Sequence, residues 1–285
     1  MKRIFINSEK EIQRYLCKFY YIGSKVYFGS QRQHDKLSIE ECIISALKKQ
    51  KYLKDVKTSQ IEFASRTDKL VSAKGAAFSF LTRKIPILME INTTLPQNIG
   101  LWGYSKVPMD YLSRYNAIYR HYKYIVPMVS SYNIEIMRDA CKILEGRHDF
   151  INFSRIKLGE DIKTIRDMDL VKLSVINDFF IFDFKSRAFL RQQIRRMVKK
   201  VLEVGAGEIG LEEFKQLLNP LKRISYQPSE AMGLILWDIR YKDQIKFFED
   251  PKSIKRMKDF FIRKIEKHKL KYQLFRALQQ DNFSQ

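Results

Sequence analysis

Residues 119–146 read YRHYKYIVPMVSSYNIEIMRDACKILEG, and this stretch decides which fold class the sequence predicts. Its first part is rich in aromatic and β-branched residues, so a strand is expected at 122–126. In an extended segment Tyr122 and Tyr124 lie on one face and Lys123 lies on the other. Such a strand presents its tyrosines either to a core or to a ligand.

The second part of the stretch has the marks of a helix. Asn133 is a favoured N-cap residue, and Gly146 is the residue type that most often ends a helix. Apolar side chains recur between them at helical spacing, so five are expected to face inward: Ile136, Met137, Ala140, Cys141 and Leu144. The stretch is therefore a strand followed by a helix.

The same alternation continues on both sides of this unit. Further strands are expected at 15–22, 60–64, 76–81, 99–107, 165–175, 179–184 and 234–241. Helices are expected after a capping box at 38–41 and at 86–92, 188–204, 211–218 and 251–279. Alternation in both halves predicts two α/β units, at 1–110 and 111–250, followed by a basic C-terminal helix within 251–285.

The chain has 285 residues, 45% of them apolar, and a formal net charge of +21. It can therefore fold around a core, and its charge predicts a polyanionic partner, either nucleic acid or an acidic membrane surface. No apolar run is long enough to span a bilayer, and the N-terminus turns polar too soon for a signal peptide.

Cofactor and metal motifs are the next test of function class. The three cysteines lie far apart without a CxxC pair, and the four histidines show no HxxxH or HExxH spacing. A disulfide framework and a zinc site are therefore not expected, and the compartment is expected to be reducing. No GxxxxGK[ST] loop occurs, and the glycines at 204–207 are too few for a nucleotide cradle. Neither a metal nor a cofactor is predicted.

Asp68 is the first candidate for chemistry, because it follows an expected strand within Ser65-Arg66-Thr67-Asp68. A carboxylate at the mouth of a sheet can act as a nucleophile or a base, and the nearby Arg66 favours its ionised form. The plainer interpretation is an aspartate that organises a turn, and the tetrapeptide alone does not separate the two.

The second candidate is the segment from Lys185 to Lys200, which holds seven basic residues and no acidic one. Arg191, Arg195 and Lys199 follow one another at intervals of four, so they share one face of the expected helix. Like charges at this spacing repel each other. Either an internal carboxylate or phosphate groups offset them, or the face is simply solvated.

The third candidate interleaves aromatic and basic residues, at Arg114 and again from Arg120 to Tyr124. Aromatic rings beside cations suit the stacking of bases next to a phosphate track. The plainer alternative is a core strand that buries its tyrosines.

Together these segments resemble the TruA family of tRNA pseudouridine synthases, in the manner of an archaeal-like member. The resemblance covers most of residues 15–241 and follows the family's order. It is carried by YIGS (21–24), FGSQRQ (28–33), SRTD (65–68), INTTLPQNI (91–99), YLSR (111–114), RHYKY (120–124), GRHDFINF (146–153), AFL (188–190) and AMGL (231–234). Departures from the family pattern are Ile22 for an acidic residue, Ser30 for a tryptophan, Lys69-Leu70 for a small pair, and Ser72 for a histidine frequent in bacterial members.

The resemblance implies that the protein isomerises uridine to pseudouridine in the anticodon stem-loop of tRNA, around tRNA positions 38–40. It implies that Asp68 is the essential carboxylate, that Arg195 is its ion-pair partner, and that Tyr122 stacks on the target base. The substrate-binding residues that it implies are Gln31, Arg66, Arg114, Arg120, Arg191 and Leu234.

The implied fold is α+β, the pseudouridine synthase fold, with two joined antiparallel-rich sheets, helices on the outside and a central cleft. The implied enzyme is a cytoplasmic homodimer that binds tRNA and no membrane. Two alternatives stay open. One is a non-catalytic tRNA-binding or RNA-chaperone protein of the same fold, and the other is a membrane-surface protein acting through residues 251–285.

Overall fold

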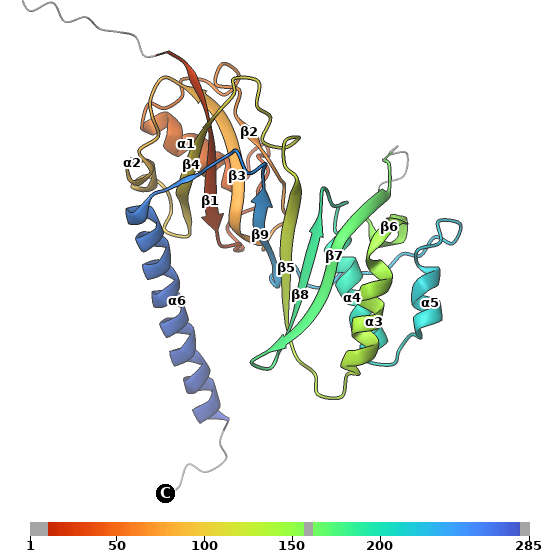
Figure 1. Ribbon diagram of the computed structural model, residues 1–285. Helices are drawn as coiled ribbons and strands as arrows, with labels where there is room; N and C mark the ends of the chain where they lie inside the picture. The colour runs from red at the N-terminus through yellow and green to blue at the C-terminus, as the bar shows by residue number, and fades with distance from the viewer. Residues whose placement is uncertain (1–10, 157–161, 280–285) are drawn as a thin grey trace, which may run out of the picture.

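The computed structural model describes residues 11–156 and 162–279, in which the chain forms a mixed α+β fold around one ten-stranded sheet (Figure 1). The strands are β1 (Gln13–Tyr21), β2 (Glu62–Phe63), β3 (Ser72–Thr82), β4 (Ile99–Val107), β5 (Tyr119–Pro127), β6 (Gly146–Asp149), β7 (Ile165–Ile176), β8 (Phe179–Ser186), β9 (Leu234–Arg240) and β10 (Phe248–Glu249). The helices are α1 (Ile39–Lys49), α2 (Leu88–Asn92), α3 (Ile134–Leu144), α4 (Gln193–Gly205), α5 (Leu211–Gln216) and α6 (Pro251–Leu278), with a 3-10 turn at Ile151–Phe153. The N-terminal residues on which the signal-peptide prediction rests and the end of the segment 251–285 lie outside the described residues.

The strand order is β10-β4-β1-β3-β9-β5-β8-β7-β6, with β2 beside β3. All pairings between these strands are antiparallel except that of β3 with β9. The α+β class with antiparallel-rich sheets is therefore confirmed. The expected two sheets are joined edge to edge by β9, which lies between β3 and β5 and makes them one.

Two local sequence signals set the helix starts as predicted. The Ser38 hydroxyl accepts a hydrogen bond from the Glu41 amide at 3.2 Å, and the Asn133 side chain accepts one from the Ile136 amide at the same distance. Gly146 follows α3 with a φ of +87°, a conformation that glycine adopts without steric cost. Met137, Ala140, Cys141 and Leu144 are buried as expected, but Ile136 is 37% exposed, because it lies in the first turn on the solvent side.

The largest error concerns the helix expected at 188–204. The helix α4 begins only at Gln193, because Gln192 has a left-handed backbone with a φ of +62°. The Gln193 side chain accepts a hydrogen bond from the Leu190 amide at 2.8 Å, which holds the preceding residues in a loop. Arg191 therefore lies in this loop and does not share a helix face with Arg195.

Strand bounds also differ from the sequence pattern. The strand expected at 60–64 shrinks to Glu62–Phe63, because Gln60 has a φ of +43° and the Ala64 carbonyl accepts a hydrogen bond from the Arg120 side chain. The strand β3 begins at Ser72, four residues before its expected start, because β1 and β9 flank its first residues. The short strands β6 and β10 were not predicted, since they have only four and two residues.

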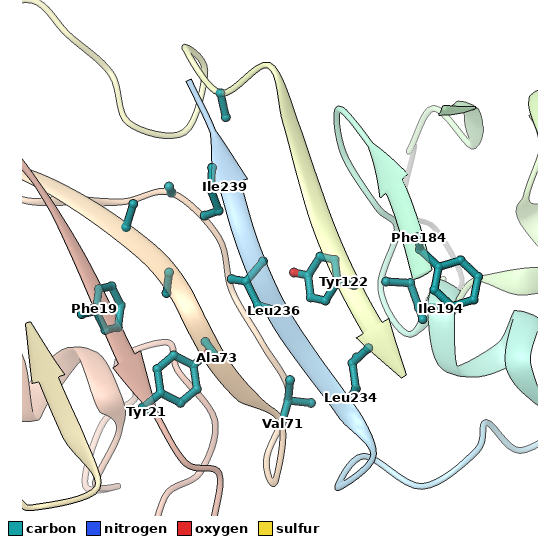
Figure 2. Close-up of a cluster of buried hydrophobic side chains, with 14 of the residues drawn as sticks. Phe19, Tyr21, Val71, Ala73, Tyr122, Phe184, Ile194, Leu234, Leu236 and Ile239 are labelled. Carbon is teal, nitrogen blue, oxygen red and sulfur yellow. The ribbon is translucent and has the colours of Figure 1, made fainter. Parts of the chain in front are cut away.

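Apolar side chains from both parts of the chain meet where the sheet is joined. Figure 2 shows apolar side chains along one face of the sheet: Phe19 and Tyr21 from β1, Val71 just before β3, Ala73 within β3, Leu234 and Leu236 from β9, and Tyr122 from β5. Helices α3, α4 and α5 contact one another, and α3 also packs on β7. One continuous core thus runs beneath the join.

The other face of the sheet carries a buried cation at the same join. The Lys18 ammonium group on β1 donates to the Asp238 carboxylate and to the Ile239 carbonyl on β9. Burial lowers the pKa of Lys18, while the neighbouring Asp238 acts in the opposite direction. This bridge spans β3, so it ties the two parts of the sheet together independently of their backbone hydrogen bonds.

Gly75 is the position at which the join tolerates no side chain. A Cβ there would lie 2.7 Å from the Asp238 Oδ1 and 2.8 Å from the Trp237 carbonyl oxygen. We expect Gly75→Ala to lower the free energy of unfolding by about 1–3 kcal/mol, the usual cost of overpacking, as measured by urea denaturation. The control is Gly103→Ala on β4, where a Cβ would meet nothing closer than 3.4 Å. Equal stability of the two variants would contradict this account.

Candidate active site

The loop that carries Asp68 is fixed by hydrogen bonds from a second loop. The Thr67 amide donates to the Ser30 hydroxyl at 2.7 Å, and the Ser30 amide donates to the Thr67 carbonyl at 3.1 Å. The Tyr21 hydroxyl lies 2.6 Å from the Thr67 Oγ1. Ser30 is a departure from the family pattern. Its two hydrogen bonds with Thr67 form a latch that fixes the residue next to Asp68.

Two glycines let these loops approach each other closely. Gly29 has a φ of +100°, and a Cβ there would lie 3.0 Å from the Thr67 carbonyl oxygen. A Cβ on Gly23 would lie 2.3 Å from the Leu70 backbone, which itself has a left-handed φ of +71°. The backbone on both sides of Asp68 is therefore held from outside, while its side chain remains 37% exposed.

Asp68 forms an ion pair with Arg195 from the other part of the sheet. The Arg195 Nη1 lies 3.1 Å from the Asp68 Oδ2, and the Arg195 Nε donates to the Ser229 carbonyl at 2.8 Å. The Arg195 side chain is only 13% exposed. Because the guanidinium is a rigid fork with a second fixed contact, it holds the carboxylate in one place as well as stabilising its charge.

Tyr122 lies at the base of the same site. Its hydroxyl is 3.1 Å from the Ser65 Oγ, and its ring makes an edge-to-face contact with Phe189 at a centroid distance of 5.2 Å. Burial raises the pKa of Tyr122, and Asp68 nearby acts in the same direction. The phenol is therefore neutral at physiological pH and can donate a proton or a hydrogen bond.

These residues line a cleft of about 1070 Å³. Of the residues that the structure describes, eight basic side chains line its walls against three acidic ones, Glu40, Glu62 and Asp68. The basic residues are Arg66, Lys69, Arg114, Arg120, Arg155, Arg166, Arg191 and Arg195. A cleft with this surplus of positive charge attracts a polyanion, and the positive field inside the cleft is concentrated on that ligand.

The nine site residues that the resemblance implied all line this cleft, but they do so in different ways. Gln31, Arg66, Arg114 and Arg191 are exposed, whereas Leu234 is buried at the start of β9. Arg120 is also buried, and its guanidinium donates to the carbonyls of Ala64, Arg114 and Arg187. Its contacts hold the wall of the cleft together, so it acts on the site through the backbone.

Several contacts in and beside the cleft do not follow from the sequence. Ser65 and Ser30 are common loop residues, and nothing in their spacing indicates that they contact Tyr122 and Thr67. Arg155 follows the 3-10 turn and Arg166 lies near the start of β7, and only the fold brings these two side chains to the cleft. Lys69 was noted as a departure, and its ammonium group lies 4.3 Å from the centre of the Phe28 ring at the mouth.

The described residues form neither a metal centre nor a dinucleotide cradle. Across the described ranges, no three His, Cys, Asp or Glu side chains gather as a metal site would need. Residues 205–210, GAGEIG, extend the glycine pair that seemed too short and do match GxGxxG. They connect α4 to α5, however, whereas a dinucleotide site needs a strand before the glycines.

Helix α6 packs on the sheet only at its start. Met257 and Phe260 are buried against Tyr20, but every residue from Ile262 to the end of the helix is exposed. Figure 1 shows this part standing away from the rest of the chain. Within the described residues, no helix is both long enough and apolar enough to cross a membrane.

Comparison with known proteins places this site in a family. A family model described as tRNA pseudouridine synthase matches residues 140–242. The tRNA pseudouridine synthase A of Methanosarcina mazei is 32% identical over 93% of this chain and 98% of its own length. This chain belongs to the tRNA pseudouridine synthase family. The Methanothermobacter thermautotrophicus member is 33% identical over 86% of this chain and 87% of its own length.

Solved structures resemble this tRNA pseudouridine synthase family member only distantly. The archaeal box H/ACA sRNP Nop10–Cbf5 complex aligns with a TM-score of 0.34 and 12% sequence identity. The alignment covers 66% of this chain and 44% of that chain, so this chain spans less than half of it.

The latch between Ser30 and Thr67 leads to a testable prediction. Ser30→Ala leaves the Thr67 amide without its acceptor, which costs about 1–3 kcal/mol for a buried donor. We expect hydrogen exchange at the Thr67 amide to accelerate at least tenfold while β1 and β3 keep their protection. The control is Ser45→Ala on α1, whose exposed hydroxyl donates a hydrogen bond to Glu41 and, within the described part of the chain, forms no other. Unchanged exchange at Thr67 would show that Ser30 does not hold the loop.

Proposed function

We propose that this protein isomerises uridine to pseudouridine in tRNA, with Asp68 as the essential carboxylate. The observation that carries the proposal is the 3.1 Å ion pair between Asp68 and Arg195, set in a cleft with a large cationic surplus. An ionised carboxylate exposed to a cleft that attracts nucleic acid is the arrangement that the reaction needs. Membership of the family supports the same conclusion.

The reaction exchanges one bond to the ribose for another. The C1′–N1 bond breaks and a C1′–C5 bond forms, while N1 gains a proton and C5 loses one, so atoms and electrons balance without an external reagent. Asp68 would act by attack on the sugar, by attack on the base at C6, or by removal of a sugar proton. Each route uses the charged carboxylate that the Arg195 guanidinium stabilises.

The other cleft residues have separate parts in this proposal. Tyr122 and Leu234 would contact the flipped base, and the neutral phenol of Tyr122 could relay the proton that leaves C5. Arg66 and Arg191 are exposed on the walls and would meet phosphates. The target nucleotide must leave its stack, which costs a few kcal/mol and is offset by such phosphate contacts.

From the family resemblance we further propose that the target lies in the anticodon stem-loop, around tRNA positions 38–40. We also propose that the protein is a cytoplasmic homodimer that binds tRNA across both subunits. We propose that Asp68 belongs to one unit, residues 1–110, and that Tyr122, Arg195 and Leu234 belong to a second unit, residues 111–250.

Replacement of the carboxylate tests the proposal. We expect Asp68→Asn to abolish tritium release from tRNA labelled at uridine C5, because the amide can neither attack nor accept a proton, while tRNA still binds. The control is Glu62→Gln, which lines the same cleft and can still accept the hydrogen bonds from Ser113 and Arg114. Full turnover by Asp68→Asn would show that Asp68 is not the essential carboxylate. Binding without tritium release by the natural sequence would favour the non-catalytic alternative.

A conservative change at the partner cation tests its geometry. Lysine keeps the charge of Arg195 but cannot contact Asp68 and the Ser229 carbonyl at the same time. We expect Arg195→Lys to lower kcat by about 100-fold or more, with a much smaller change in KM, because the pair positions the carboxylate. Single-turnover tritium release measures this effect. A kcat close to that of the natural sequence would mean that charge alone suffices.

A further inference from the structure

A second depression in the surface opens directly from the catalytic cleft. This groove of about 500 Å³ shares Arg114, Tyr115, Arg120, Arg166 and Ala188 with the cleft. It continues between the β6–β7 edge of the sheet and the loop after β8, over Arg147, Lys163 and Arg187. A ligand chain that leaves the cleft at Tyr115 therefore meets this groove next.

The groove is strongly cationic. Among the described residues, six that line it are arginine or lysine, and Asp167 is the only acidic one. Asp167 lies opposite Arg147 in the register of β6 and β7, so it offsets one charge at most. Arg147, Lys163 and Arg187 are exposed and form no ion pair with any residue in the described ranges.

Two guanidinium groups beneath the groove lack a neutralising partner as well. Arg120 is buried and donates to backbone carbonyls, and no carboxylate lies close enough to form an ion pair with it in the described part of the chain. Arg166 donates to the carbonyls of Lys163 and Ile165, while its buried Nε has no acceptor there. Burial lowers the pKa of both residues. The positive charge of these two residues beneath the groove thus adds to that of the exposed residues along its walls.

An exposed aromatic ring marks the junction of cleft and groove. Tyr115 is 64% exposed, and the Arg114 guanidinium lies over its ring at 5.7 Å from the ring centre. An aromatic ring in solvent beside a cation is the arrangement on which proteins stack unpaired bases. It also differs from Tyr122, which is buried inside the cleft.

We propose that this groove binds the RNA segment next to the target uridine, with Tyr115 stacking a flanking base and Arg147, Lys163 and Arg187 holding its phosphates. The inference rests on the proposed function and assigns a second RNA-binding site to it. Cations without protein partners, arranged in a track that begins at the catalytic cleft, favour a phosphodiester chain over an isolated anion. The groove would set affinity and the choice of flanking structure, and it would leave the bond exchange to Asp68.

The phosphate contacts are tested with the triple variant Arg147→Gln, Lys163→Gln, Arg187→Gln. We expect KM for full-length tRNA to rise about tenfold or more, with kcat at saturation within twofold of the natural sequence. The plot of log Kd against log salt should become shallower by about 2, since each contact to a single strand contributes roughly 0.7. The control removes three equally exposed charges elsewhere: Lys48→Gln, Lys49→Gln, Lys54→Gln.

The stacking contact is tested with Tyr115→Ala and its conservative counterpart Tyr115→Phe. We expect Tyr115→Ala to raise KM about tenfold, as the loss of one stacked base does, and Tyr115→Phe to restore it. A stem-loop trimmed to remove the nucleotides flanking the target should bind the natural sequence and the triple variant equally, since it cannot reach the groove.

The outcomes separate the groove from the catalytic assignment. If the triple variant keeps the KM and salt dependence of its lysine control, or if only kcat falls, the groove does not bind RNA and the inference is wrong. If the natural sequence itself releases no tritium from any tRNA, the proposed function fails. A thermal melt that matches the control confirms that lost affinity does not reflect unfolding.

Discussion

The ion pair between Asp68 and Arg195 is the constraint that the rest of the structure satisfies. Asp68 comes from a loop beside β3, and Arg195 comes from α4 on the far side of the join, so their 3.1 Å separation requires both parts of the sheet to be in register. The close approach at Gly75, the bridge from Lys18 to Asp238 and the latch from Ser30 to Thr67 all serve this requirement. A partly exposed pair contributes little to stability, about 1 kcal/mol or less, so its value lies in placing a charged oxygen.

The cationic surplus divides into groups with different physical roles. Lys18 is buried and structural, Arg120 holds backbone carbonyls at the wall of the cleft, and Arg195 neutralises and orients Asp68. The remaining cations of the cleft and groove are mostly exposed and remain available for phosphates. This division explains how one carboxylate can function among so many positive charges, since only Arg195 contacts it in the described structure.

Much of the fold could be predicted because its signals are local. The strand β4 has the expected bounds, and α1 and α3 begin at the capping residues Ser38 and Asn133. The late start of α4 could not be predicted, because it depends on the left-handed backbone of Gln192 and on a side-chain contact of Gln193. Asp68, Tyr122 and Arg195 lay in candidate segments of the sequence, but their roles came from a resemblance and not from periodicity. The contacts of Ser30 and Ser65, the place of Arg166 and the groove could not be predicted, because the fold creates them and no short segment encodes them.

The central claim is that the carboxylate held by Arg195 rearranges uridine in tRNA. The most direct measurement is a nucleotide-resolution map of pseudouridine in an unmodified tRNA transcript after incubation with the purified protein and no added cofactor. The account predicts new pseudouridine confined to the anticodon stem-loop in a time-dependent reaction. A transcript that binds the protein but contains no pseudouridine at any position after prolonged incubation would contradict it.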